Sequence, residues 1–203
     1  MIRVDLHIHT KYSGDAIISP KFIVDQLYAH PFIKGVAITD HDTLEGYHHI
    51  RKLATAYKDI LIIPGIEVST TEGHITILGV EEKPTYPLRV EDVVDFAKGR
   101  AGTIVIPHPY RNVGIGDLAR NMPVDAIEVL NPRSTRQENK MAEELAKERS
   151  LPSVAGSDAH RPQQMWTAYT EVDNELDVDD VLSAIKSGLV RVKAVSSRLQ
   201  FKC

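Results

Sequence analysis

The feature that most constrains the fold of this chain is the regular alternation between short apolar segments and longer amphipathic segments. Ser19-Pro20, for example, is a typical helix start, whereas residues 35–39 predict a buried strand. This alternation predicts a largely parallel sheet with helical crossovers. About seven strand–helix units in a single domain, residues 1–203, favour an α/β barrel over an open sheet. The expected strands cover residues 2–9, 35–39, 60–63, 66–70, 74–78, 103–106, 126–130, 153–155, 168–172 and 189–195, and the expected helices cover 20–29, 44–57, 90–98, 117–121, 136–149 and 178–186.

Composition excludes several classes of protein. The net charge of -4 gives no overall positive field that would recruit long nucleic acids. The single cysteine, Cys203, leaves no internal disulfide and no thiolate metal site. No secretory leader and no apolar run of membrane-spanning length is recognisable, so we expect a cytoplasmic protein without a membrane partner.

The first strand carries an unusual polar face. Aliphatic and polar residues alternate along residues 2–9, so Asp5, His7 and His9 share one side of the strand. Two imidazoles separated by one residue can bind the same metal ion, and imidazole is the commonest metal ligand in proteins. The alternative is a polar strand face in contact with water.

Similar polar residues follow the other predicted strands. Since the carboxyl ends of barrel strands form one face, these side chains are expected to meet there. Six of the nine histidines are at strand ends, whereas His30, His48 and His49 are expected on helix surfaces. The strand-end residues are His7, His9, His41, Glu67, His74, His108, Glu128, Asp158 and His160.

Several short motifs occur together in one order: Asp5-Leu-His-Ile-His9, Thr39-Asp-His-Asp-Thr43, Gly65-Ile-Glu-Val-Ser69, His74, Pro107-His-Pro109 and Gly156-Ser-Asp-Ala-His160. Together they closely resemble the PHP family of metal-dependent phosphoesterases, which is named for polymerases and histidinol phosphatases. The resemblance implies a distorted seven-stranded (β/α) barrel with two or three divalent metal ions at its mouth.

The same resemblance implies three sets of ligands. His7, His9, Glu67 and Asp158 would hold the first ion. Glu67 would bridge to a second ion, also held by His74 and His108, and Asp15, His41 and His160 would hold a third. Mixed imidazole and carboxylate ligands suit Zn, Mn or Fe.

Structural roles are the alternatives for individual ligands. Glu67 could form a buried salt bridge, and His108 could be a packing residue between two prolines. His74 could be an ordinary residue at a strand start, and Asp15 could lie in a plain Ser-Gly-Asp turn.

Other polar residues are expected around these ligands. Asp5, Asp40 and Asp42 are expected to orient imidazoles. Glu128 and Asn131 either contact substrate or cap a loop.

The implied reaction is hydrolysis of a phosphate ester by metal-activated water, with Glu67 and Asp158 as catalytic residues. Asp158 or a nearby histidine could be the general acid, and the sequence does not choose between them. Arg111, Arg133 and Arg161 are expected to bind phosphate, although each could equally be a solvated loop residue.

Small phosphomonoesters, such as a nucleotide or a histidinol-phosphate-like molecule, are the expected substrates. An exonuclease that acts on oligonucleotide ends is the second hypothesis, and a non-catalytic, metal-bound scaffold is the third. Amide hydrolysis on a similar barrel would call for a metal-bridging lysine on a mid-chain strand, and no predicted strand carries one.

Overall fold

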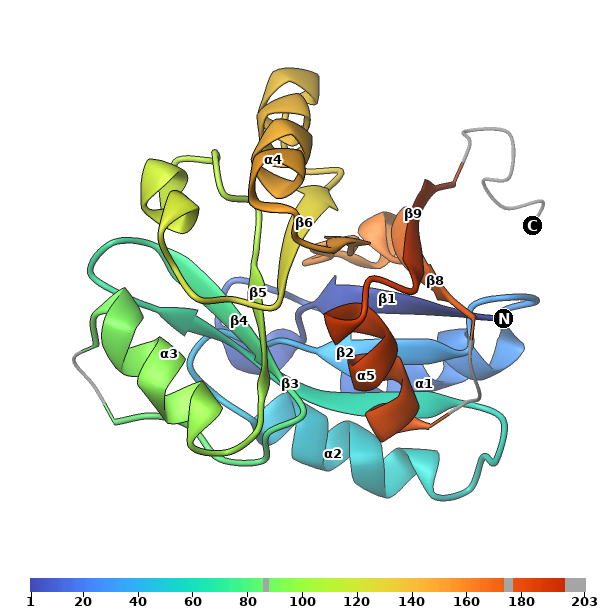
Figure 1. The fold of residues 1–203 in the computed structure, drawn as a ribbon. Coiled ribbons are helices and arrows are strands. Elements are labelled where there is room, and N and C mark those ends of the chain that lie inside the picture. Colours follow the sequence, from blue (N-terminus) through green and yellow to red (C-terminus); the bar gives the residue numbers. More distant parts are fainter. Residues whose placement is uncertain (86–87, 174–176, 196–203) are drawn as a thin grey trace.

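The computed structural model describes residues 1–85, 88–173 and 177–195, and its centre is one strongly curved sheet (Figure 1). The strand order is β7-β6-β5-β4-β3-β2-β1-β8-β9. Cys203 lies outside the described residues. The strands are β1 (Ile2–Ile8), β2 (Gly35–Ile38), β3 (Leu61–Ser69), β4 (His74–Leu78), β5 (Thr103–Ile106), β6 (Ala126–Leu130), β7 (Ser153–Ala155), β8 (Ala168–Val172) and β9 (Val190–Ala194).

The sheet forms a nearly closed barrel, which confirms the expected α/β barrel class. Two details differ from the expectation. The described part has nine strands instead of seven, and the pairs β1–β8, β3–β4, β4–β5 and β8–β9 are antiparallel. A short turn joins β3 to β4, which favours an antiparallel hairpin. The pairs β4–β5 and β8–β9 are antiparallel although α3 (Val90–Lys98) and α5 (Val178–Lys186) connect their strands.

The barrel closes where the chain after β7 meets the end of β1. Ala159 forms a parallel bridge with Ile8, and the Asp158 N–H donates to the His7 carbonyl at 2.7 Å. Gly156 permits this approach, because a Cβ there would lie 2.3 Å from the His7 Cβ atom and 2.7 Å from its main-chain nitrogen. The first and last ligand motifs of the sequence therefore become neighbours.

Helices cover the outside of the sheet, with α4 on the upper side and α2 on the lower side in Figure 1. Their starts follow the sequence signals. Ser19 accepts a hydrogen bond from the Phe22 N–H, and Thr135 forms a capping box with Glu138. The helices are α1 (Pro20–Ala29), α2 (Glu45–Ala54), α3 (Val90–Lys98), α4 (Arg136–Arg149) and α5 (Val178–Lys186), with 3-10 turns η1 (Lys11–Ser13), η2 (Gly116–Arg120) and η3 (Pro162–Gln164).

Two predicted boundaries were wrong. Residues 60–63 and 66–70 were expected as separate strands divided by Pro64, but β3 is continuous. Pro64 is accommodated within β3. It pairs with Ile38 of β2 in parallel register, and its carbonyl accepts a hydrogen bond from the Gly79 N–H. α2 ends at Ala54 instead of at residue 57. Directly after this end, the Thr55 hydroxyl donates a hydrogen bond to the Lys52 carbonyl.

The apolar core has distinct layers. One cluster packs α3 and α4 against β3 to β6, and a second packs α1 and α2 against β1 and β2. In the third cluster, α5 contributes Val181 and Ile185 beside Val4 and Ile63, which precede the polar strand ends. This layer fills the amino-terminal side of the parallel strands, so the polar side chains gather at the opposite end.

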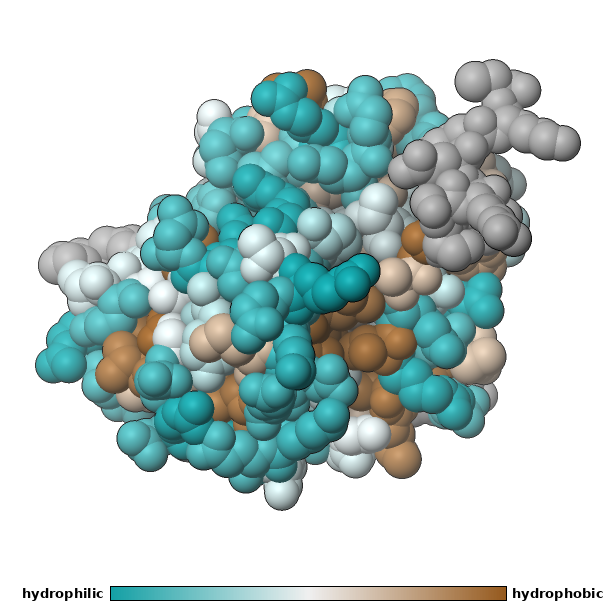
Figure 2. All heavy atoms as spheres, turned by 90° about the horizontal axis from the view of Figure 1, so that it is seen from above, coloured by the Kyte–Doolittle hydropathy of each residue, from teal (hydrophilic) through white to brown (hydrophobic). Residues whose placement is uncertain are grey.

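One face of the molecule can be followed in a space-filling view. The face in Figure 2 is largely hydrophilic, and its hydrophobic residues lie in separate, limited patches. Within the described ranges, none of the helices combines the length and apolarity needed to cross a membrane.

Candidate metal centre

Glu67 is the centre of the polar cluster at the strand ends. It lies just past the middle of β3 and only 1% of its surface is exposed. Both carboxylate oxygens face imidazoles that come from four separate segments of the chain. Oε2 lies 3.2 Å from His7 Nε2, 3.2 Å from His9 Nε2 and 3.4 Å from His41 Nδ1, and Oε1 lies 3.0 Å from His74 Nδ1 and 2.9 Å from His108 Nε2.

Asp158 is a second buried carboxylate near His7 and His9. Its Oδ1 atom lies 3.6 Å from His7 Nε2, 3.4 Å from His9 Nε2 and 3.4 Å from His160 Nδ1. The closure between residues 156–160 and β1 positions this carboxylate. His7 and His9 thus lie between two buried carboxylates.

Asp15 completes a third group with His41 and His160. Its Oδ2 atom lies 3.0 Å from His160 Nε2 and 3.6 Å from His41 Nε2. Its side chain is 53% exposed, the most solvent-accessible of the predicted ligands in these ion-pair contacts. The Ser-Gly-Asp turn nonetheless directs the carboxylate toward the imidazoles.

Four groups of donor atoms lie close enough together to hold metal ions. These groups differ in part from the predicted ligand sets. His74 lies in a group with His41 and Glu67, although His74 and His108 both contact the same Glu67 oxygen. His9 lies in the group around Asp15. The groups are His7, His9 and Glu67; His41, Glu67 and His74; His7, His108 and Asp158; and His9, Asp15, His41 and His160.

Burial and charge act against each other on the central groups. Burial lowers the pKa of His7, but Glu128, Asp158 and Glu67 outweigh it and raise that pKa well above its usual value. Burial likewise lowers the pKa of His9, and hydrogen bonds with Asp158 and Glu67 raise it to about 9. For Glu67 and Asp158, burial raises the pKa, whereas the nearby imidazoles lower it well below the usual range. The cluster therefore balances carboxylates against positive charge.

The residues that orient the imidazoles differ from those expected. Glu128 Oε1 accepts from His7 Nδ1 at 3.0 Å, and Ser13 Oγ lies 2.9 Å from His9 Nδ1. Asp5 instead accepts from the His7 and Ser157 amides, and Asp40 accepts from the Thr10 amide and hydroxyl.

The remaining polar neighbours of the cluster also accept hydrogen bonds from main-chain amides. Asp42 accepts from the Ser69 amide. Glu128 Oε2 accepts from the His108 amide and from Asn131 Nδ2, so both residues left undecided by the sequence lie inside the site. Their positions at a strand end were the available signal, whereas nothing distinguished Ser13.

Backbone strain is concentrated around the cluster. Asp42, His108 and Asp158 have φ angles of 57°, 27° and 49°, in the left-handed region. Such conformations cost on the order of 1–3 kcal/mol each and occur preferentially at functional sites. His108 is one of these strained residues, and its buried Nδ1 atom has no hydrogen-bond partner among the described residues.

Two of the three predicted phosphate-binding arginines lie beside Asp158. Arg111 Nη1 donates to Asp158 Oδ2, and Arg133 Nη1 lies 3.2 Å from Oδ1 and 2.7 Å from His160 Nδ1. Arg161 is exposed, and within the described ranges its guanidinium forms no ion pair with the cluster. Its amide donates to Gln164 Oε1.

The donor set fits divalent cations. The Nε2 atoms of His7 and His9 are only 3.1 Å apart, and both also face a Glu67 oxygen. Two neutral imidazole lone pairs and a carboxylate at this separation repel one another unless a proton or a cation lies among them. Mixed nitrogen and oxygen donors are typical of Zn, Mn and Fe sites.

The fold and this donor set define a barrel that carries a candidate polynuclear metal centre. The chain belongs to the PHP domain family, whose model matches residues 5–113, and a PHP-associated model matches residues 136–190. The first match contains the motifs from Asp5 to His108.

Two relatives are similar to this chain in sequence. An uncharacterised protein of Methanocaldococcus jannaschii is 33% identical over 142 residues, which is 64% of this chain and 82% of that protein. A 5'-3' exoribonuclease of Haemophilus influenzae is 36% identical over 87 residues, which is 42% of this chain but only 31% of that enzyme.

Among solved structures, a two-domain protein of Bacteroides vulgatus that contains a predicted PHP-like metal-dependent phosphoesterase superimposes with a TM-score of 0.80 at 18% identity. The similarity covers 95% of this chain and 64% of that protein. At this level of identity the match supports the fold alone.

Proposed function

We propose that this chain is a hydrolase that cleaves small phosphomonoesters at a metal centre. The observation that carries the proposal is the convergence of five imidazoles on the two oxygens of Glu67, a carboxylate that is 1% exposed. We infer that residues 1–203 act as one domain, because the first and last ligand motifs meet across the barrel closure. The proposed ligands are His7, His9, Asp15, His41, Glu67, His74, His108, Asp158 and His160.

The groups of donor atoms support two or three divalent ions, with Zn, Mn and Fe as the candidates. When bound, such ions would activate water and neutralise charge on the phosphoryl oxygens. Glu67 contributes both carboxylate oxygens to neighbouring groups, so it is the proposed bridge. Its buried position leaves no bulk water to compete for either oxygen.

The chain's own residues would bind and orient the substrate. Arg111 and Arg133 place two guanidinium groups beside Asp158, and guanidinium is suited to two-point contact with phosphate. An arriving phosphate would compete with Asp158 for these donors. The pKa of Asp158 lies well below its usual range because of the nearby imidazoles, so this carboxylate has no proton to deliver, and a nearby histidine is the proposed donor of a proton to the leaving oxygen.

The geometry of the β3–β4 hairpin supports a small substrate. Ser69 pairs directly with His74, so the chain passes from Glu67 to His74 in one tight hairpin, with no inserted segment over the cluster at this point. Small molecules such as nucleotides or histidinol-phosphate-like esters therefore remain our first choice. The net charge of -4 also disfavours long polyanions.

A second candidate is exonuclease action on oligonucleotide ends. The exoribonuclease of Haemophilus influenzae is the observation in its favour, although the match covers 42% of this chain. The same arginines would then bind a terminal phosphate. Comparing a short 5'-phosphorylated oligoribonucleotide with its mononucleotide would separate the two candidates.

The proposal is tested by metal analysis of the purified protein, followed by a phosphate-release screen with an aryl phosphate, mononucleotides and short oligonucleotides. Glu67→Gln keeps the side-chain shape but removes the bridging charge, so we expect a loss of roughly a thousandfold or more. Glu91→Gln, on the exposed side of α3, is the matched control and should retain full activity.

Three outcomes would contradict the proposal. Metal-loaded wild-type protein without turnover on any of these esters would favour the non-catalytic scaffold. Glu67→Gln protein with more than about a tenth of wild-type activity would show that Glu67 is not the bridge. Activity on oligonucleotides without activity on monoesters would favour the exonuclease.

A further inference from the structure

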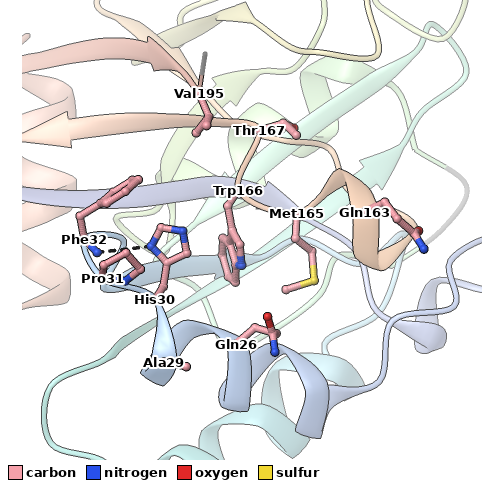
Figure 3. Close-up of a pocket in the computed structure, with 10 residues that line it drawn as sticks. All are labelled: Gln26, Ala29, His30, Pro31, Phe32, Gln163, Met165, Trp166, Thr167 and Val195. Carbon is pink, nitrogen blue, oxygen red and sulfur yellow. Dashed lines mark hydrogen bonds between the residues drawn. The ribbon is translucent and has the colours of Figure 1, made fainter. Parts of the chain in front are cut away.

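A second cavity lies outside the metal centre, between the end of α1 and residues 163–167 (Figure 3). Its volume is about 360 Å³, within the range typical of small-molecule sites. Its wall includes Gln26, His30, Phe32, Gln163, Met165 and Trp166. None of its lining residues is an aspartate, glutamate, lysine or arginine.

Aromatic rings form one end of this cavity. His30 and Phe32 meet edge to face, with ring centroids 4.5 Å apart, and His30 and Trp166 do so at 6.0 Å. Figure 3 shows the His30 and Trp166 rings on facing sides of the lining, with the Gln26 side chain below them. Such walls favour a planar ligand that can stack or pack edge to face.

His30 supplies a hydrogen-bond donor whose tautomer is determined by its neighbours. Its Nδ1 atom accepts from the Ile33 amide at 2.9 Å and from the Phe32 amide at 3.4 Å. Burial, together with the charges of Lys34 and Arg3, lowers the pKa of His30 to about 4, so the ring is neutral at pH 7. The remaining proton is then on Nε2, which has no protein partner among the described residues and lies on the Trp166 side of the ring in Figure 3.

Trp166 is held in an uncommon conformation. Its φ angle of 65° is left-handed, a genuine outlier for a bulky residue, and the side chain is 4% exposed. Strain of this kind persists only where the surroundings determine the conformation, and it occurs at ligand clamps. The ring therefore forms a fixed wall of the cavity and does not fill it.

We propose that this cavity binds a neutral, planar heteroaromatic molecule of the free nucleobase class. The rings accommodate the flat faces, His30 Nε2–H donates to a ring nitrogen or carbonyl, and the amides of Gln26 and Gln163 can pair with a mixed donor–acceptor edge. A charged ligand is disfavoured because no lining side chain would compensate its buried charge. The site is separate from the metal centre and does not depend on the proposed hydrolysis.

The chain's single tryptophan makes the proposal directly testable. The full-length protein is titrated with adenine while Trp166 emission is followed, with and without Mn²⁺ and inorganic phosphate. We expect a saturable change with a Kd below about 1 mM that is independent of both additions. Toluene, which is planar but has no polar edge, should bind at least tenfold more weakly.

Two substitutions that place a leucine on α1 locate the site. Ala29→Leu fills the cavity from an exposed position of α1 and should weaken adenine binding at least tenfold. Lys21→Leu adds an apolar side chain to the same helix away from the cavity and should bind as the wild type does. Circular dichroism confirms that both variants are folded.

The proposal is overturned if Trp166 emission shows no saturable response up to about 10 mM adenine. Equal affinity in Ala29→Leu would place the ligand elsewhere and also overturn it. Toluene binding as tight as adenine binding would show that the cavity selects apolar surface alone, for example a side chain of a partner protein.

Discussion

At the residue scale, the site depends on side chains that hold the proposed ligands as much as on the ligands themselves. Glu128 is 2% exposed and uses both oxygens: one accepts from His7 Nδ1 and the other from the His108 amide and Asn131. It therefore holds two proposed ligands, one on β1 and one in the loop after β5. A carboxylate that orients metal-binding imidazoles is commonly worth a factor of 10–100 in affinity or activity.

Replacing Glu128 by Gln should lower phosphate release by about 10–100-fold, because the amide nitrogen cannot accept one of these bonds. Metal content should fall or become labile to dialysis, while the far-ultraviolet spectrum remains unchanged. Glu144→Gln, on the exposed face of α4, is the control. Equal activity of Glu128→Gln and wild-type protein would show that His7 does not need this partner.

A substitution at Asp15 tests whether a third metal ion binds. Of the proposed ligands around His41 and His160, it is the one whose side chain is more than half exposed. Asp15→Asn should therefore remove about one equivalent of metal and leave the ions at Glu67 in place. Anomalous scattering from Mn-soaked crystals would show the missing peak beside His41 and His160. An unchanged metal content in the variant would contradict a third site that uses Asp15.

Side chains that the motifs singled out by residue type and position lie close together in the structure. Each of the nine predicted ligands lies in one of the donor groups, although their assignment to particular ions remains a proposal. The regrouping of His74 with His41 could not be predicted, because side-chain direction depends on the register between β3 and β4. Ser13 could not be found either, since a serine near a Gly-Asp turn is an ordinary turn residue.

At the element scale, β1 packs closely against the chain after β7 in the site. Gly156 has no side chain, and this absence permits the His7 backbone and Cβ atom to approach. The same contact carries the hydrogen bond from Asp158 N to His7 O. Barrel closure and ligand placement are therefore a single packing event.

Gly156→Ala should destabilise the fold by about 1–3 kcal/mol and reduce activity more than the loss of folded protein explains. The added Cβ would have to displace His7, since backbone cannot move aside as a flexible side chain can. Gly99→Ala is the matched control: its φ of -62° suits alanine and the nearest atom would be 3.5 Å away. Urea denaturation and phosphate release, both measured on each variant, check the prediction.

Element boundaries were predictable where a capping signal was present. Ser19-Pro20 marks a helix start that the structure confirms. Pro64 misled the prediction because proline usually ends a central strand, whereas its missing N–H is tolerated in the parallel register with β2. The mixture of parallel and antiparallel pairs likewise depends on long-range neighbours that local periodicity does not contain.

At the scale of the whole molecule, the proposed metal centre should contribute to stability. Its ligands come from strands on both sides of the barrel closure, and ions that bind only the folded state stabilise it by mass action. At a free metal concentration about a thousandfold above Kd, binding adds roughly 4 kcal/mol to the free energy of unfolding. For a chain of this size, that gain raises Tm by about 10 °C.

Chelation followed by reloading with Mn²⁺ or Zn²⁺ should therefore lower and then restore Tm in calorimetry. The difference should shrink in Glu67→Gln, whose metal affinity is reduced, and remain in Glu91→Gln. Identical melting curves for chelated and loaded wild-type protein would contradict a metal centre that spans the closure.

The closure of residues 156–160 onto β1 also determines when the site can exist during protein synthesis. His7 and His9 leave the ribosome first, yet their partners Asp158 and His160 are translated some 150 residues later. Until then, the nascent chain has imidazoles and carboxylates without the geometry that joins them. A product truncated before Asp158 therefore lacks this arrangement of side chains, and the proposed hydrolytic activity would report that residues 1–160 have been made and folded.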